Sequence, residues 1–159
     1  MSKVLRTASG FKSLVCSFAT MYPYGQINIA SGDNFIPTNY RSGELYGEFQ
    51  CDTTNGRIVI PAHSADYIRL SGRICGSGNC WCRVTLYDEN DTYINEAASL
   101  YQPNNSGYVQ APIASRIVKI PNTNKSYYVK LQVQGYNHSF YLNDGFGSTA
   151  SYMCVEKVI

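Results

Sequence analysis

Apolar and polar residues alternate along several segments of the chain, and this alternation is typical of β-strands that bury one face. Between residues 65 and 75, Ile68, Leu70 and Ile74 fall on one side, whereas Tyr67 falls on the other. Successive side chains of a strand point to opposite faces, so each such segment has an inner and an outer face. The same alternation recurs in residues 80–87 and 126–134.

The outer faces of these predicted strands carry aromatic side chains. The chain has 14 tyrosines, and several of them fall on the polar side of the alternation. A strand with one apolar face and one aromatic, polar face can cover a core on one side and contact another subunit on the other. We therefore expect an oligomer, and the candidate interface residues are Tyr67, Trp81, Tyr87, Tyr128 and Tyr152.

Turn signals separate the predicted strands. Asn55-Gly56 is a strong tight-turn signal because both residues tolerate a positive φ. About eight to ten short strands, with no convincing helix between them, predict an all-β sandwich or barrel. Strands are expected at residues 45–51, 57–61, 65–75, 80–87, 92–96, 108–110, 115–120, 126–134, 139–142 and 148–159.

The first 45 residues differ from the rest because turns break them into short extended pieces. We interpret residues 1–45 as an extended N-terminal arm that anchors the protein to a partner, and residues 46–159 as the head domain. The alternative is that this region supplies the first strands of the domain. The candidate anchor residues are Leu14, Val15 and Phe18.

Composition excludes several classes of function. The net charge is only +2 and no cluster of Lys or Arg accompanies it, which argues against nucleic-acid binding. No run approaches the ~20 apolar residues that a membrane-spanning helix needs, so no membrane insertion is expected. The N-terminus lacks the apolar stretch of a signal peptide, and we expect synthesis in the cytoplasm.

The six cysteines and two histidines are the remaining candidates for chemistry. Without a secretion signal, free thiols are the default. The spacing of Cys75 and Cys80 leaves open a disulfide across a hairpin, or a zinc site completed by Cys51 or His63. Neither His63 nor His138 lies in a catalytic motif, so we expect loop histidines, no cofactor and no enzyme.

Three segments together resemble a known family. They are Ile58-Val59-Ile60-Pro61 followed by Tyr67-Ile68-Arg69-Leu70, then Val129-Lys130-Leu131-Gln132-Val133, and the closing segment 148–159. Their order is similar to that of the tumour necrosis factor-like and complement-type globular heads, over a stretch from Tyr46 to Val158. The resemblance implies a jelly-roll β-sandwich that assembles as a threefold homotrimer.

Leaderless jelly-roll trimers of this kind resemble bacteriophage virion proteins. The resemblance therefore implies a structural virion protein, made in the host cytoplasm, that decorates a capsid or forms a head fibre. Its N-terminal arm would dock on the major capsid protein or another virion protein. The alternative is a receptor-binding tip, an adhesin that recognises a host surface glycan or protein; a glycan hydrolase is a third class. Fold alone does not decide among them.

Overall fold

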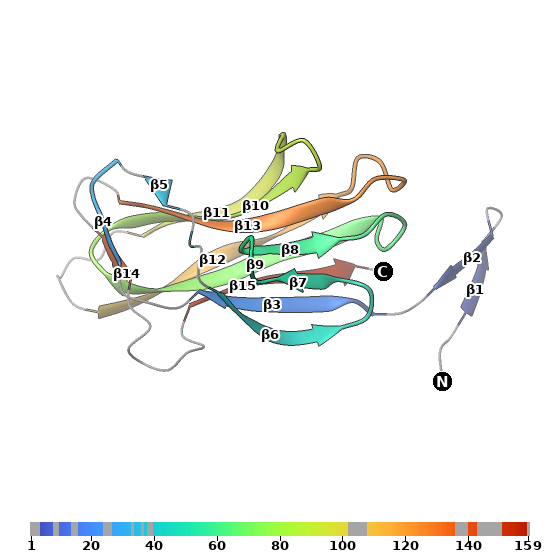
Figure 1. Ribbon diagram of the computed structural model, residues 1–159, viewed down its shortest axis with the longest axis horizontal. Helices are drawn as coiled ribbons and strands as arrows, with labels where there is room; N and C mark the ends of the chain where they lie inside the picture. Colours follow the sequence, from blue (N-terminus) through green and yellow to red (C-terminus); the bar gives the residue numbers. More distant parts are fainter. Residues whose placement is uncertain are drawn as a thin grey trace.

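The protein is a β-sandwich of two sheets, as a computed structural model shows (Figure 1). All the strands that pair do so in antiparallel fashion, and no helix occurs among the residues described. The predicted all-β jelly-roll fold is confirmed. The structure describes residues 4–7, 10–13, 16–23, 27–32, 34–35, 37, 40–101, 108–135, 140–142 and 151–158.

One layer of the sandwich is a six-stranded sheet built around a long central strand, β13 (Tyr127–Gly135). Along one edge β13 pairs with β10; along the other it pairs with β8 and, further on, with β5. The order across the sheet is β11 (Tyr93–Tyr101), β10 (Cys80–Asp88), β13, β8 (Arg57–Ile60) and β7 (Gln50–Asp52), with β5 (Asn34–Phe35) beside β13.

The other layer is a seven-stranded sheet organised around β9 (Tyr67–Ser77). One edge of β9 pairs with β15 and β14, and the other edge pairs with β12. The order is β4 (Ile27–Ile29), β14 (Phe140–Leu142), β9, β15 (Tyr152–Val158), β3 (Phe18–Pro23) and β6 (Tyr40–Tyr46), with β12 (Tyr108–Lys119) beside β9.

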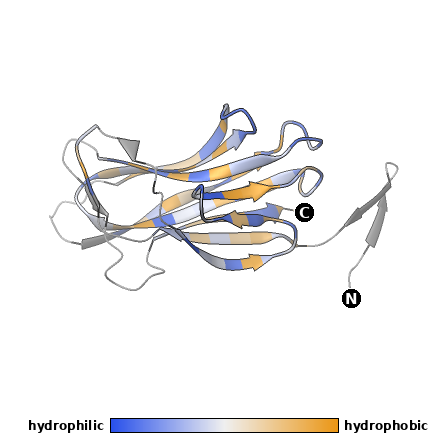
Figure 2. Ribbon diagram, viewed as in Figure 1, coloured by the Kyte–Doolittle hydropathy of each residue, from blue (hydrophilic) through white to orange (hydrophobic). Residues whose placement is uncertain are grey.

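The core lies between the two sheets and is filled by the residues that alternation places on the inner faces. Ile68, Leu70 and Ile74 of β9 are fully buried, and they meet Val84 and Leu131 of the opposite sheet. Figure 2 shows hydrophobic positions along the strands of both layers. The predicted inner faces are therefore confirmed, because burial follows the two-residue period of the strands.

The sandwich begins well before residue 45, which corrects the predicted boundary between arm and head. Strand β3 lies inside the seven-stranded sheet, between β15 and β6, and its Ala19 and Met21 are fully buried. Phe18, predicted to be an anchor for a partner, is half-buried in this strand. Leu14 and Val15 lie outside the described residues. Deleting residues 1–45 would remove β3, β4 and nearly all of β6 from the seven-stranded sheet and β5 from the six-stranded sheet, so the truncated chain would not keep its fold.

Only the first two strands stand apart from the sandwich. Strand β1 (Val4–Thr7) pairs with β2 (Gly10–Ser13) in a hairpin that forms a sheet of its own. Figure 1 shows this hairpin beyond the end of the sandwich, joined to it through the segment that precedes β3. This hairpin is therefore the described part of residues 1–45 that pairs with neither sheet of the sandwich.

The predicted strand at residues 45–51 is in fact two strands in different sheets. Gly47 has a φ of +79°, and a Cβ atom there would lie only 2.6 Å from the carbonyl oxygen of Cys16. The chain turns at Gly47 and passes from β6 in one layer to β7 in the other. A left-handed residue with no room for a side chain requires glycine, and this turn separates the two strands.

Candidate interaction surfaces

The five predicted interface residues lie on two different sheets, so they cannot form one surface. Tyr67 and Tyr152 belong to β9 and β15, on the outer face of the seven-stranded sheet, which we call the seven-stranded face. Trp81, Tyr87 and Tyr128 belong to β10 and β13, on the outer face of the six-stranded sheet, the six-stranded face. Each face has to be considered by itself.

On the six-stranded face, a row of aromatic side chains crosses adjacent strands. Tyr87 lies opposite Tyr93 on one side and Tyr128 on the other, and Tyr128 lies opposite Val59. The rings of Tyr87 and Tyr128 stack with centroids 5.5 Å apart and an angle of 18° between their planes. Tyr128 is only 5% exposed. It has almost no surface left for a second subunit to contact.

Hydrogen bonds fix these two tyrosines further. The side-chain amide of Gln132 donates to the Tyr87 hydroxyl at 2.8 Å, and its oxygen accepts from the Thr85 hydroxyl at 3.1 Å. The Tyr128 hydroxyl donates to the Asp91 carboxylate. Burial is the main cause that raises the pKa of both Tyr128 and Tyr87, so both stay neutral at physiological pH.

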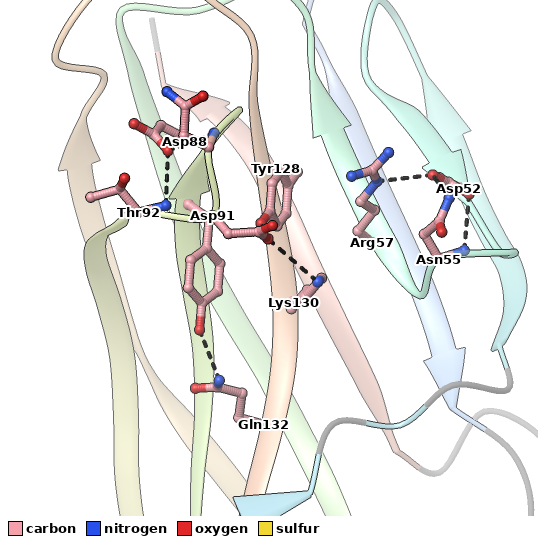
Figure 3. Close-up of polar contacts among 11 residues, drawn as sticks. Asp52, Asn55, Arg57, Asp88, Asp91, Thr92, Tyr128, Lys130 and Gln132 are labelled. Carbon is pink, nitrogen blue, oxygen red and sulfur yellow. Dashed lines mark hydrogen bonds and ion pairs between the residues drawn. The ribbon is translucent and has the colours of Figure 1, made fainter.

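Cations and carboxylates on the six-stranded face are paired with one another. Figure 3 shows Arg57 beside Asp52 and Lys130 beside Asp91. The charged groups of Arg57 and Lys130 each lie 5.1 Å from the Tyr128 ring centroid, a cation–π distance. The three ion pairs of this face are Arg57–Asp52 at 2.9 Å, Lys130–Asp91 at 4.0 Å and Arg83–Glu96 at 3.9 Å.

On the seven-stranded face, large apolar side chains at the two ends of one cross-strand row reach solvent. Register places five residues from five neighbouring strands in one cross-strand row: Tyr46, Phe18, Glu156, Arg69 and Ile117. Arg69 and Glu156, in the middle, form an ion pair at 3.0 Å. At the two ends, Tyr46 is 65% exposed and Ile117 is 54% exposed. Tyr67, on the strand of Arg69, is 44% exposed.

Further along the seven-stranded face, small residues and then aromatic ones follow this row. Thr20, Cys154 and Ser71 lie opposite one another on three strands. Beyond them, the Arg73 guanidinium lies 5.4 Å from the ring centroid of Tyr152. Aromatic residues and arginine are enriched where proteins contact other proteins. This face therefore has the composition of a subunit interface.

The cysteine cluster does not form the predicted hairpin. Cys75 lies inside β9 in the seven-stranded sheet, whereas Cys80 begins β10 in the six-stranded sheet, so the loop of residues 78–79 joins the two layers. Neither thiol forms a disulfide, and Cys80 belongs to the buried core cluster. Burial raises the pKa of the Cys154 thiol to about 11, which keeps it protonated and unreactive at neutral pH.

The described part of the chain holds no cluster of candidate metal ligands. There, no three His, Cys, Asp or Glu side chains gather closely enough to hold a metal ion. His63 is an exposed loop residue with a φ of +64°, and His138 lies outside the described residues. No helix in the described residues is long and apolar enough to cross a membrane.

Comparison with solved structures shows the fold. No protein-family model and no curated protein matches the chain. A crystal structure of murine APRIL matches with a TM-score of 0.59 and 8% identity, over 90% of this chain and 99% of that one. Eiger TNF from S. frugiperda gives 0.60 and 4%, over 91% and 94%. The globular domain of zebrafish complement 1qA gives 0.52 and 5%, over 91% and 98%. The predicted resemblance to this fold is confirmed.

Sequence reasoning missed the residues at the ends of the seven-stranded row. Tyr46 was placed at the start of a strand that does not exist as predicted, and Ile117 was placed in a short strand rather than in the long β12. A signal was present for Ile117. Neighbouring residues of a strand point to opposite faces of the sheet. If Val118 is buried, Ile117 must therefore face outward, as it does.

Proposed function

We propose that the chain is a non-enzymatic structural protein of a bacteriophage virion, a homotrimeric jelly-roll head held on the particle by its N-terminal hairpin. One observation carries the proposal, namely the exposed aromatic and aliphatic residues of the seven-stranded face. Scattered single apolar residues on a surface are ordinary, but a set gathered on one face marks an interaction site. Tyr46, Tyr67 and Ile117 form such a set around the Arg69–Glu156 pair.

The size of this face fits a subunit contact. A specific interface buries about 800 Å² on each partner, and one aromatic side chain supplies roughly 150–250 Å² when it is fully buried. The exposed parts of Tyr46, Tyr67, Phe18, Tyr152 and Ile117 supply roughly half of that area, because each side chain is already partly buried, and the polar residues around them would supply the rest.

The hairpin of β1 and β2 supports the proposed attachment. It pairs only with itself, so its removal takes no strand from either sheet of the sandwich. A two-stranded hairpin alone is marginally stable in water. Contact with a partner, here the capsid protein or another virion protein, would supply the missing stabilisation.

Reconstitution on particles tests this proposal. We expect the full-length chain to bind bacteriophage particles assembled without it, and a chain lacking residues 1–13 to remain a folded trimer that no longer binds them. A Tyr93→Ser variant, altered at an exposed residue of the six-stranded face, is the matched control and should bind normally. Equal binding by the shortened chain, or no binding by the full-length chain, would rule out attachment through the hairpin.

A further inference from the structure

Trp81 lies at one end of the six-stranded face, away from the stacked tyrosines. Its ring is 38% exposed. On β11 its cross-strand neighbour is Leu100, which is half-exposed, and on β13 its neighbour is Gln134. Trp81 and Tyr87 are six positions apart on β10, which is about 20 Å along a strand. Trp81 and Leu100 therefore form an apolar surface of their own.

Polar groups border this apolar surface. The Arg83 guanidinium lies 5.1 Å from the Trp81 ring centroid. Arg83 is paired with Glu96 at 3.9 Å, and each of these two side chains is about one-fifth exposed. The amide of Gln134 donates to the backbone oxygen of Gly32 at 3.2 Å, which holds it in place beside the ring. We call Trp81, Leu100, Arg83, Glu96 and Gln134 together the Trp81 surface.

We propose that the Trp81 surface binds a neutral oligosaccharide. A pyranose ring has an apolar C–H face and a rim of hydroxyl groups. The Trp81 indole and Leu100 contact the apolar face of the sugar, because an aromatic ring with a solvent-exposed edge combines apolar contact with hydrogen bonding nearby. Each hydroxyl both donates and accepts hydrogen bonds. The Arg83–Glu96 pair offers donors and an acceptor side by side, and Gln134 adds an amide.

Charge and area both favour this occupant. The cations of the six-stranded face are matched by carboxylates, and Arg83 in particular is matched by Glu96, so an acidic ligand gains no uncompensated charge. Two exposed apolar side chains fall far short of the roughly 800 Å² that a specific protein partner covers. They do suffice for one or two sugar rings. The inference does not depend on the homotrimer, because a single chain carries all five residues.

Trp81 is the chain's single tryptophan, so its fluorescence reports on this surface alone. The experiment screens the full-length chain on an array of neutral oligosaccharides of glucose, galactose and N-acetylglucosamine, with sialylated glycans alongside. The strongest binder is then titrated. We expect a change in Trp81 emission that saturates with a dissociation constant of about 1 mM or tighter.

Variants separate binding from folding. Trp81→Ala should weaken binding at least tenfold by calorimetry, Trp81→Phe should weaken it less because a ring remains, and Glu96→Gln should weaken it severalfold with an unchanged melting temperature. Tyr67→Ser, on the opposite sheet, should bind like the wild type. The inference is overturned if no neutral glycan changes the emission, if only sialylated glycans bind, or if Trp81→Phe and Glu96→Gln bind as tightly as the wild type.

Discussion

Two groups of aromatic residues, one on each outer face of the sandwich, differ in how far their own chain covers them. On the six-stranded face, Tyr128 is covered by Tyr87 and by cations of its own chain, and its hydroxyl is bonded to Asp91. On the seven-stranded face, Tyr46 and Tyr67 remain largely exposed. An aromatic residue on the outer face of a strand can therefore be covered by its own chain, or it can be exposed and available for contact with a partner.

The difference lies in which residues the neighbouring strands supply. Tyr128 is on a central strand, so Tyr87 and Arg57 reach it from both sides. Tyr46 is on β6 at the edge of its sheet, and Ile117 is on β12 at the other edge. An edge strand has a neighbour on one side only, so the exposed ends of the row lack the lateral cover that Tyr128 receives.

The strongest test of this comparison places charge on the exposed face. We expect the double variant Tyr67→Arg, Ile117→Arg to convert the homotrimer to a monomer, because like charges from each copy would meet in a contact depleted of water. Size-exclusion chromatography with light scattering measures the change. Tyr93→Arg, at an exposed tyrosine of the six-stranded face, is the control and should stay trimeric. The comparison breaks if both variants behave alike.

A second prediction concerns the covered face. We expect Tyr128→Ala to lower the free energy of unfolding by about 3 kcal/mol, since it removes a buried, stacked ring. Tyr93→Ala, in the same cross-strand row but exposed, should change it by no more than about 0.5 kcal/mol. Urea denaturation measures both. Equal losses in the two variants would show that Tyr128 is not covered by its own chain.

Alkaline pH should act on the covered face as well. The folded protein raises the pKa of Tyr128, whereas the unfolded chain keeps a value of about 10. This contribution to stability is therefore complete below pH 10 and is lost as pH rises toward the folded pKa, by up to about 1.4 kcal/mol per pH unit. Tyr128→Phe should show a shallower decline between pH 10 and 11.5 in urea titrations. An unchanged slope would contradict this assignment.

The smallest expected effect concerns the Arg69–Glu156 ion pair of the exposed face. Both side chains are partly exposed, at 44% and 39%, so solvent screens their attraction. In the monomeric Tyr67→Arg, Ile117→Arg background, a double-mutant cycle with Arg69→Met and Glu156→Gln should give a coupling energy below about 1 kcal/mol. A much larger coupling in that monomer would mean that the pair is not screened as its exposure indicates.

The sequence predicts the inner faces well because they depend on local periodicity. Ile68 and Leu70 are buried by the same rule that makes Tyr67 face outward, whichever strand lies beside them. The sheet order and register are non-local, and they decide whether Tyr128 meets Tyr87 or solvent. The place of β3 was missed for the same reason. The apolar character of residues 18–23 is visible in the sequence, but the pairing of this strand with β15 and β6 is not.

The Cys75–Cys80 segment illustrates a related limit. A short loop between two strands predicts a hairpin when the strands pair, but here the loop of residues 78–79 crosses from one sheet to the other. Loop length alone does not distinguish these two connections. The candidate interface residues do lie on outward-facing positions of their strands. They are divided between two faces because the chain passes from one sheet to the other between β9 and β10.

The mass of the wild-type chain in solution tests the central claim most directly, namely that copies meet through the seven-stranded face. Light scattering over a micromolar concentration range should give three times the 17.7 kDa of one chain. Hydrogen–deuterium exchange on the same sample should show stronger protection of the edge strand β6 in the trimer than in the Tyr67→Arg, Ile117→Arg variant. A mass of 17.7 kDa across the whole range would contradict the account.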